Sequence, residues 1–492
     1  MGAVWRSGVA VRLSFAIEVF VARPLREVQS PELSLDVIRL FKHYLPRPLL
    51  LLGLLEIGLI FLSSGFAWMV GGNAPDLTSR LTEMIVYTVT VYMLMLGLGS
   101  YQLSSFRSVR MTGARLTAAM VLSVAILSAI VLFVPDLTIY RLVVIYAVAM
   151  SFLFIVVTRT LFLAIIGWRR FREPIVVLGA GRQGQRMNKL ANEQTAGFRI
   201  VETFALTEAP ENMPAAVPFC DVPSLADFCY ANDVEEVVLA LDERRGALPS
   251  EALLETKIAG ISITDMSSYL ERMTGRVDLA SVHPSWLIFS DGFLGASTFA
   301  VVSKRLFDLI ASGVLLILSS PILIVTALAV KLTSAGPVFY RQERVGQFGR
   351  TFEVMKFRSM GVDAEKDGAV WAQAADPRVT PVGRVIRATR IDEIPQIFNV
   401  FKGDMSFVGP RPERPVFVRE LAREIPFYNE RHVVKPGITG WAQLNYPYGA
   451  SIEDARHKLE YDLYYIKNYS LFLDIVTLIQ TVRVVVWQDG VR

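Results

Sequence analysis

Four long apolar runs in the first third of the chain constrain its fold more than any other feature. They cover residues 49–71, 84–99, 116–134 and 142–167. Each approaches or exceeds the roughly 20 residues that a helix needs to cross a bilayer. Helices buried in a soluble core are the alternative, but four such runs so close together favour a transmembrane bundle over residues 37–168. The hydrophobic fraction of 52% agrees with a membrane protein.

Basic residues around these runs predict the orientation of the bundle. They gather before the first run, in the second connection and after the fourth run, in the sequence "WRRFR". The first and third connections carry acidic residues and few basic ones. Because Lys and Arg concentrate in cytoplasmic loops, the N-terminus and the segment after residue 168 are expected on the cytoplasmic side.

Two charged residues lie inside the runs. Glu56 belongs to the first run, and a carboxylate at mid-bilayer costs a few kcal/mol. It is therefore expected near an interface or against neighbouring helices. The same two placements are expected for Arg159, which lies in the second half of the fourth run and whose long side chain can reach the interface.

A fifth apolar run, residues 309–330, is also long enough to cross a bilayer. Basic residues flank it on both sides, and Ser320 and Pro321 stand in its middle. Proline removes a backbone donor and clashes with the preceding turn, and serine hydroxyls can bond the freed carbonyls. A kinked full span is the alternative. The flanking charges favour a re-entrant hairpin over residues 305–331, which enters and leaves the membrane on one side.

The rest of the composition excludes several classes of protein. Residues 1–36 are interpreted as an extension without a convincing signal-peptide cleavage site. The net charge of +4 gives no indication of a nucleic-acid partner. Cys220 and Cys229 are the only cysteines, and no histidine lies near them at metal-ligand spacing. A disulfide framework and a zinc site are therefore excluded, and a reducing compartment fits.

Residues 173–300 alternate strand-like and helix-like segments, which predicts an α/β Rossmann-like middle domain. Ile175–Leu178 is expected to be a buried strand, and Gly179, Gly181 and Gly184 follow it at the start of a helix. This G-x-G-x-x-G spacing can hold a phosphate on backbone amides.

Two observations argue against a nucleotide-dependent activity in this domain. Glu202 lies within the second predicted strand and Glu208 beyond it, so neither is at the usual position of a ribose-binding acid. Tyr230 and Tyr269 lack a lysine four residues later, which argues against an epimerase or dehydratase. A structural or dimerising domain is favoured, while a regulatory nucleotide pocket and a homodimer stay open.

Residues 301–492 carry the candidate chemistry. Asp392 and Glu393 stand side by side in "RIDEIPQIFNV", and Arg384, Arg387 and Arg390 precede or adjoin them at every third position. We expect the arginines to form a cationic helix stripe, whose positive charge favours phosphate binding. For the acidic pair alone, a helix cap with a neighbouring solvated acid is the alternative.

The local sequence predicts how Asp392 is held. If it caps a short helix, Pro395 falls in the first turn, and the helix runs to Val400 or Phe401 and stops at Gly403. The helix N-terminus and the arginines are then expected to lower the pKa of Asp392. Consecutive helical residues point about 100° apart, which favours different tasks for the two carboxylates.

The ordered motifs "FEVMKFRSM", "RIDEIPQIFNVFKGDMSFVGPRPERP" and "KPGITGWAQLNY" carry a resemblance over about residues 300–492. The chain resembles the bacterial sugar transferases, polyprenyl-phosphate phosphoglycosyl transferases that start surface polysaccharide assembly. The apolar runs and Rossmann-like domain resemble the long form found with exopolysaccharide clusters. The resemblance implies a multi-pass protein of the bacterial inner membrane, with a monotopic, α-rich catalytic domain on the cytoplasmic side.

The resemblance also implies a reaction and residue roles. A sugar 1-phosphate passes from a UDP-sugar to undecaprenyl phosphate, and UMP leaves. Asp392 would be the nucleophile that forms a covalent phosphosugar intermediate, and Glu393 would associate with Mg²⁺. The candidate substrate-binding residues are Lys356, Arg358, Arg384, Arg387, Arg411 and Asp462. Direct attack by the lipid phosphate, with Asp392 as base, and a non-enzymatic scaffold that senses a nucleotide are the alternatives.

Other features of the terminal third are less specific. The segment "KPGITG" at residues 435–440 is interpreted as a tight active-site loop, with an ordinary turn as the alternative. The end of the chain, from Tyr461, is expected to form either an interfacial amphipathic helix or a helix packed on the hairpin. His432 and His457 match no catalytic need.

Overall fold

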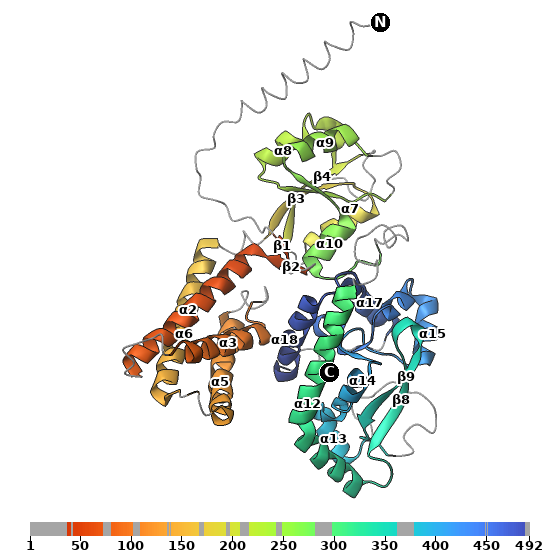
Figure 1. Cartoon of the computed structure of the whole chain (residues 1–492). Coiled ribbons are helices and arrows are strands. Elements are labelled where there is room, and N and C mark those ends of the chain that lie inside the picture. Colours follow the sequence, from red (N-terminus) through yellow and green to blue (C-terminus); the bar gives the residue numbers. More distant parts are fainter. Residues whose placement is uncertain are drawn as a thin grey trace.

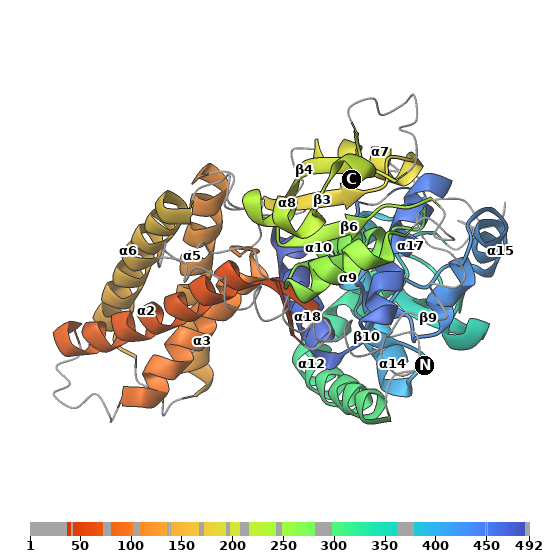
Figure 2. The same cartoon turned by 90° about the horizontal axis from the view of Figure 1, so that it is seen from above.

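The computed structural model describes residues 37–40, 43–71, 80–101, 109–134, 137, 139–166, 172–192, 197–206, 216–242, 248–280, 298–361, 378–447, 449 and 451–487. The extension expected at residues 1–36 lies outside these ranges, as do many of the basic residues that connect the apolar runs. The described chain forms a helical bundle, a sheet domain and a terminal domain. In both views the bundle stands to one side of the other two (Figure 1, Figure 2).

The bundle consists of apolar helices, as predicted. They are α2 (Arg47–Gly71), α3 (Leu81–Gly97), α5 (Val109–Phe133) and α6 (Arg141–Ile166). Helices α2, α5 and α6 each contain a 24-residue segment that is long and apolar enough to cross a membrane. Helix α3 has only 17 residues. At about 1.5 Å per residue, α3 is slightly shorter than the hydrocarbon core of a bilayer.

An ion pair lies buried inside this bundle. Arg159 Nε and Nη2 donate to the two carboxylate oxygens of Glu56 over 2.7 and 3.0 Å. Tyr101 donates to the same carboxylate, and Arg159 Nη1 donates to the carbonyl of Ser100. Glu56 faces neighbouring helices, as expected. Arg159 likewise faces neighbouring helices rather than the interface. Its side chain is 3% exposed, and the paired carboxylate compensates its charge inside the bundle.

The middle domain is a five-stranded parallel sheet with the order β5-β4-β3-β6-β7. The strands are β3 (Glu173–Leu178), β4 (Phe198–Ala205), β5 (Val217–Pro218), β6 (Glu236–Leu239) and β7 (Ser262–Asp265). The helices are α7 (Arg182–Ala191), α8 (Leu225–Ala231), α9 (Ser250–Ile258) and α10 (Met266–Thr274). Alternate residues of β3 enter two separate cores, one on each face of the sheet. This is the predicted Rossmann-like arrangement.

The terminal domain is rich in helices, as predicted. Its helices are α12 (Thr298–Thr333), α13 (Pro381–Ala388), α14 (Gln396–Lys402), α15 (Pro415–Glu424), α16 (Trp441–Asn445), α17 (Ile452–Lys467) and α18 (Leu471–Trp487). Strands β8 (Phe339–Val345) and β9 (Thr351–Phe357) form an antiparallel hairpin, and β10 (Ser406–Val408) pairs in parallel with β11 (Gly437–Thr439). Tyr464, Tyr465 and Leu473 are fully buried in the main core of this domain. The last helices therefore pack inside the domain, which agrees with the second of the two expectations for the chain end.

The fifth apolar run lies within a single helix of 36 residues, α12, with Pro321 inside it. Residues 305–331 thus do not form a hairpin of two separate helices, and α12 instead changes direction in its lower part (Figure 1). Ser320 Oγ donates over 2.7 Å to the carbonyl of Ile317, the oxygen that Pro321 leaves without a backbone donor. The serine therefore compensates the proline as the sequence predicted.

Buried bonds connect the middle domain to the terminal domain. Lys467 Nζ donates to Glu271 over 2.5 Å, and both side chains are at most 10% exposed. Trp441 Nε1 donates to the carbonyl of Gly275 over 2.8 Å. Helix α18 also contacts α3 of the bundle. The terminal domain is therefore in contact with both the middle domain and the apolar bundle.

Candidate active site

The acidic pair lies in a tight turn between α13 and α14. Residues Ile391–Glu393 form one 3₁₀ turn, and Pro395 caps α14. The expectation that Asp392 caps the helix is therefore wrong by three residues. Helix α14 ends at Lys402, one residue beyond the expected range, and Gly403 follows with a φ of 102°, a conformation that favours glycine.

The expected arginine stripe does not continue along one helix. Arg384 and Arg387 belong to α13, but Arg390 follows the helix with a φ of 57°. A left-handed residue turns the chain sharply, so Arg390 leaves the α13 stripe. Arg387 and Arg390 nevertheless contribute positive potential at Asp392, whereas Arg384 is exposed on α13.

Glu393 is held by two cations. Its Oε1 accepts from Lys356 Nζ over 2.7 Å and from Arg411 Nη2 over 3.1 Å. Burial alone would raise the pKa of Glu393, but the charges of Arg411 and Lys356 outweigh burial and lower it well below the ordinary value. Glu393 is therefore a fixed carboxylate at neutral pH. Strand β9 supplies Lys356, and the segment after β10 supplies Arg411.

Asp392 differs from its neighbour in both contacts and electrostatics. The residue is 9% exposed, and its carboxylate makes no hydrogen bond or ion pair within the described part of the chain. Burial, followed by the negative charge of Glu393, raises the pKa of Asp392, although Lys356, Arg390 and Arg387 oppose the shift. The expectation that arginines lower this pKa is wrong, because burial and the adjacent carboxylate dominate.

The two carboxylates therefore suit different tasks. Two neighbouring acids whose pKa values shift in opposite directions are a recurrent feature of catalytic pairs. Glu393 is fixed by ion pairs, and the Asp392 carboxylate beside it has no partner among the residues that the structure describes. The geometry supplies one nucleophile or base and one charge that positions cations. Three-dimensional structure thus favours the division of labour expected from sequence.

Two predicted substrate-binding residues lie deeper than the acidic pair. Arg358 is 5% exposed, and its Nη2 donates to the carbonyl and hydroxyl of Ser334, just beyond α12. Its Nε and Nη1 are buried without a hydrogen-bond partner among the described residues. Asp462 is 2% exposed and pairs with Arg431 over 2.8 Å. Burial raises the pKa of Asp462 to about 6 against the opposing charge of Arg431.

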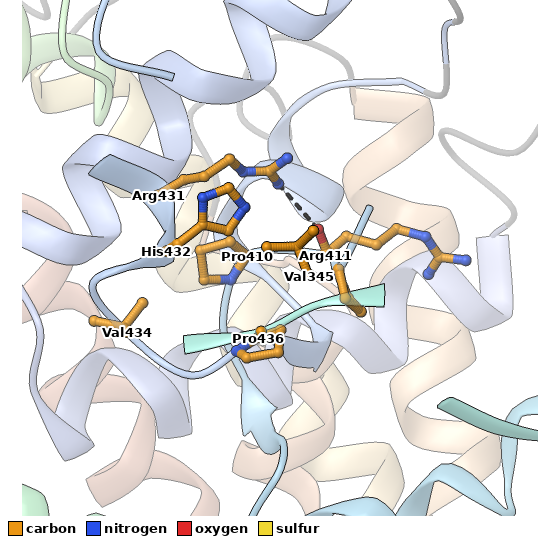
Figure 3. A pocket seen from close by; sticks show the side chains of 9 residues that line it. Val345, Pro410, Arg411, Arg431, His432, Val434 and Pro436 are labelled. Atoms are coloured by element: carbon orange, nitrogen blue, oxygen red, sulfur yellow. Dashed lines mark hydrogen bonds between the residues drawn. The ribbon is translucent and has the colours of Figure 1, made fainter. Parts of the chain in front are cut away.

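Sequence reasoning did not identify Arg431. Its Nη2 donates over 3.1 Å to the backbone carbonyl of Arg411, a bond drawn in Figure 3. Its Nη1 donates to Tyr428 over 2.7 Å. Asp462 pairs with the same arginine, so it helps to position the backbone of Arg411 indirectly. A single arginine in "FYNERH" carries no local signal of this role.

The glycine-rich turn of the middle domain is closed by the protein itself. Asp242 accepts from the backbone amides of Arg182 and Gln183 at the start of α7, over 2.8 and 3.0 Å. A Cβ at Gly181 would lie 2.2 Å from the same carboxylate. The amides that hold phosphate in such turns therefore bind Asp242, and this contact favours the structural interpretation of Gly179, Gly181 and Gly184.

Comparison with known protein families gives two matches. Residues 299–488 match the family model described as bacterial sugar transferase. The matched segment contains the whole acidic site. Residues 97–247 match the model described as a CoA-binding domain, which includes α5, α6 and much of the sheet.

Curated relatives match the same parts of the chain. A UDP-N-acetylgalactosamine-undecaprenyl-phosphate N-acetylgalactosaminephosphotransferase from Aeromonas hydrophila is 46% identical over 240 residues, 49% of this chain and 56% of that protein. A UDP-glucose:undecaprenyl-phosphate glucose-1-phosphate transferase from Klebsiella pneumoniae is 48% identical over 184 residues, 37% of this chain and 40% of that protein. The chain thus spans about half the length of these relatives. A UDP-glucose:undecaprenyl-phosphate glucose-1-phosphate transferase from Escherichia coli (strain K12) is 33% identical over 329 residues, 64% of this chain and 69% of that protein.

Proposed function

Since the chain belongs to the bacterial sugar transferase family, we propose that it transfers a sugar 1-phosphate from a UDP-sugar to undecaprenyl phosphate and releases UMP. The observation that carries this proposal is the buried Asp392 carboxylate, which has no partner within the described ranges. It lies beside Glu393, which Lys356 and Arg411 hold. The names of the relatives given above all describe transfer to undecaprenyl phosphate. The transfer would start the assembly of an exopolysaccharide repeat unit.

The first half of the proposed reaction uses Asp392 as the nucleophile. A carboxylate oxygen attacks the β-phosphorus of the UDP-sugar, an Asp392 oxygen–phosphorus bond forms, and the bond from that phosphorus to the bridging oxygen breaks. UMP leaves with the bonding electron pair. Lys356 and Arg411 place two positive charges beside the acidic pair, so they can stabilise charge on the diphosphate as it develops.

The second half returns Asp392 to its starting state. A phosphate oxygen of undecaprenyl phosphate attacks the same phosphorus, the aspartyl oxygen–phosphorus bond breaks, and the sugar leaves as an undecaprenyl diphosphate sugar. Burial and the neighbouring Glu393 raise the pKa of Asp392, which makes its carboxylate more basic than that of a solvated aspartate. Activity is lost as pH falls through this pKa, because the nucleophile must be ionised.

Glu393 also fits a magnesium site that it would share with the substrate phosphates. The described residues contain no cluster of three or more His, Cys, Asp or Glu side chains. Mg²⁺ often binds through one or two carboxylates together with substrate phosphates, and Glu393 Oε1 is the oxygen that both cations contact. Glu393 Oε2 is therefore the oxygen that would hold the ion, and Asp392 stays available for attack. When bound, Mg²⁺ would neutralise charge on the diphosphate.

A substrate panel tests this proposal. The full chain in detergent is offered UDP-sugars, including UDP-glucose and UDP-N-acetylgalactosamine, with undecaprenyl phosphate and Mg²⁺, and UMP is measured. At least one UDP-sugar should release UMP, in step with lipid-linked sugar, and EDTA should stop the reaction. Silence across the whole panel would contradict the proposed transfer.

The ends of α12 support a re-entrant placement in the membrane. Near its start, Asp308 accepts from Ser406 Oγ of the terminal domain over 3.1 Å. Near its end, Val330 packs against Phe357 of the same domain. Apolar side chains between these contacts are 50–74% exposed, namely Val314, Ile317, Leu318, Ile324 and Val325. A straight span would carry one end of the helix to the opposite membrane surface.

Cysteine labelling tests this topology and the proposed cytoplasmic face of the inner membrane. Val302→Cys and Leu332→Cys, at exposed positions near the two ends of α12, are made without the two native cysteines. Both should react only with a membrane-permeant maleimide in intact spheroplasts. Phe133→Cys, at the far end of α5, should react with an impermeant one. Impermeant labelling at one end of α12 alone would indicate a full span.

A further inference from the structure

The backbone of Arg390 is held in an unfavourable conformation. Its φ of 57° and ψ of 14° lie in the left-handed region, which glycine adopts freely and which costs other residues free energy because of their Cβ atom. Arg390 follows α13 and immediately precedes the 3₁₀ turn that carries Asp392. Backbone strain of this kind clusters at functional sites. The strain is therefore a reason to expect a task for the Arg390 side chain.

The Arg390 side chain is available for a ligand. The residue is exposed, and its side chain makes no hydrogen bond or ion pair with any residue that the structure describes. By contrast, Lys356 and Arg411 are bound to Glu393. The charge of Arg390 nevertheless acts on both carboxylates of the acidic pair. Arg390 is therefore a cation beside the site whose donors the described part of the chain does not use.

The turn that follows Arg390 lies against the membrane helix α12. Ile391, the next residue, packs against the cluster formed by Val330 of α12, Phe357 of β9 and Ile386 of α13. Helix α14, on the other side of the turn, also contacts α12. Figure 1 shows α13 and α14 beside the lower part of α12. The backbone at Arg390 is thus next to the helix that is proposed to enter the membrane.

Exposed apolar side chains occur on both helices that meet at this turn. Val385 of α13 is 61% exposed, and Phe398 and Phe401 of α14 are 40% and 51% exposed. Short helices that present apolar side chains beside a membrane helix are typical of an interfacial surface. The phosphate of a membrane lipid arrives at this level, because its chain stays in the bilayer. An exposed arginine between these apolar residues in the chain is therefore placed to meet a lipid phosphate.

The second half of the proposed reaction needs a cation at this place. The lipid phosphate must approach a phosphorus that already carries negatively charged oxygens, so two anions come together. An arginine binds a phosphate through two parallel N–H donors and reduces this repulsion. Glycine or asparagine at residue 390 would form the same turn with less strain but would not supply the charge. The strained backbone is explained if the charge is required.

Resting on the proposed function, we propose that Arg390 binds the phosphate of undecaprenyl phosphate and holds it for attack on the phosphosugar carried by Asp392. Arg390 is then a binding residue for the lipid acceptor, and Asp392 keeps its role as nucleophile. Contact of the same guanidinium with the diphosphate of the UDP-sugar is the alternative that the experiments separate.

Substitutions at Arg390 should change stability and activity in opposite directions. Arg390→Gly should raise the temperature of unfolding by about 1–3 °C, because glycine relieves the left-handed strain. The same variant should transfer about tenfold more slowly at limiting undecaprenyl phosphate. Arg390→Lys, which keeps a positive charge, should recover part of the rate. A lower unfolding temperature for Arg390→Gly, or transfer at the wild-type rate, would overturn the proposal.

Phe348→Gly is the matched control. Phe348 lies between β8 and β9 and has a similar left-handed backbone, with a φ of 56° and a ψ of 28°. Its side chain is 69% exposed. Phe348→Gly should therefore gain a similar stability and transfer at the wild-type rate. A similar loss of transfer in Phe348→Gly would show that relief of strain alone slows the enzyme, and would overturn the role of the Arg390 charge.

Binding and kinetics identify the phosphate that Arg390 contacts. In detergent, the full-length Arg390→Gly chain should bind undecaprenyl phosphate about tenfold more weakly than wild type, whereas undecaprenol, which lacks the phosphate, should bind both chains equally. KM for undecaprenyl phosphate should rise about tenfold, with KM for the UDP-sugar and UMP binding nearly unchanged. A raised KM for the UDP-sugar alone would assign Arg390 to the diphosphate and overturn the proposal. Absence of UMP release from every UDP-sugar, with Arg390-dependent binding of undecaprenyl phosphate intact, would overturn the transfer alone.

Discussion

Replacing Asp392 by asparagine should abolish sugar-phosphate transfer, with a loss of about 10⁴-fold or more in rate. The amide has almost the same shape but cannot form the oxygen–phosphorus bond that the proposed mechanism requires. Lys356, Arg411 and Glu393 remain in place, so substrate binding should change far less than turnover. The UMP-release assay with the best UDP-sugar of the panel measures the loss.

The same variant should unfold at an equal or higher temperature than the wild type. Burial and Glu393 raise the pKa of Asp392 in the folded chain, so the fold favours the protonated acid. This favourable contribution is present below the unfolded pKa and is lost as pH rises through the folded pKa. At neutral pH a neutral asparagine removes a charge for which burial and Glu393 outweigh the attraction of Lys356, Arg390 and Arg387. Glu424→Gln, at an exposed acid of α15, is the matched control and should change neither property.

Replacing Arg159 by methionine should lower the free energy of unfolding of the bundle by about 3–5 kcal/mol. Glu56 is fully buried, and its carboxylate would lose both donors of Arg159. Glu56→Gln alone should also destabilise, because it leaves the guanidinium of Arg159 buried without a countercharge. Denaturant unfolding of the full chain in mild detergent measures both losses.

The double variant separates this pair from ordinary packing. With both charges removed, most of the loss should be recovered, since apolar or neutral replacements of a buried pair are often close to neutral. Arg110→Met, at the exposed start of α5, is the control and should have little effect. Additive losses in the double variant would contradict a direct coupling between Glu56 and Arg159.

Local patterns predicted the elements of the chain well. The apolar runs at 49–71 and 142–167 correspond to α2 and α6 with differences of one or two residues. The glycine turn after Ile175–Leu178 opens a helix as expected, and Ser320 bonds the carbonyl that Pro321 frees. These features depend on neighbouring residues, whose spacing the sequence shows directly.

Contacts between distant residues could not be predicted in the same way. Glu56 and Arg159 are separated by 103 residues, and Asp242 lies 60 residues beyond the amide of Arg182 that it binds. The pKa of Asp392 depends on burial, which the arginine-rich sequence around it does not show. Arg431 reaches Arg411 because the chain folds back between α15 and β11.

The most direct test of the central claim is to trap the phosphosugar on the protein. The chain is incubated with Mg²⁺ and a UDP-sugar labelled in the β-phosphate, without undecaprenyl phosphate, and the labelled peptide is identified by mass spectrometry. Label should appear on the peptide that contains Asp392, be absent from Asp392→Asn, and leave when undecaprenyl phosphate is added. A chain that transfers the sugar phosphate at full rate yet never carries label would contradict the claim and favour direct attack by the lipid.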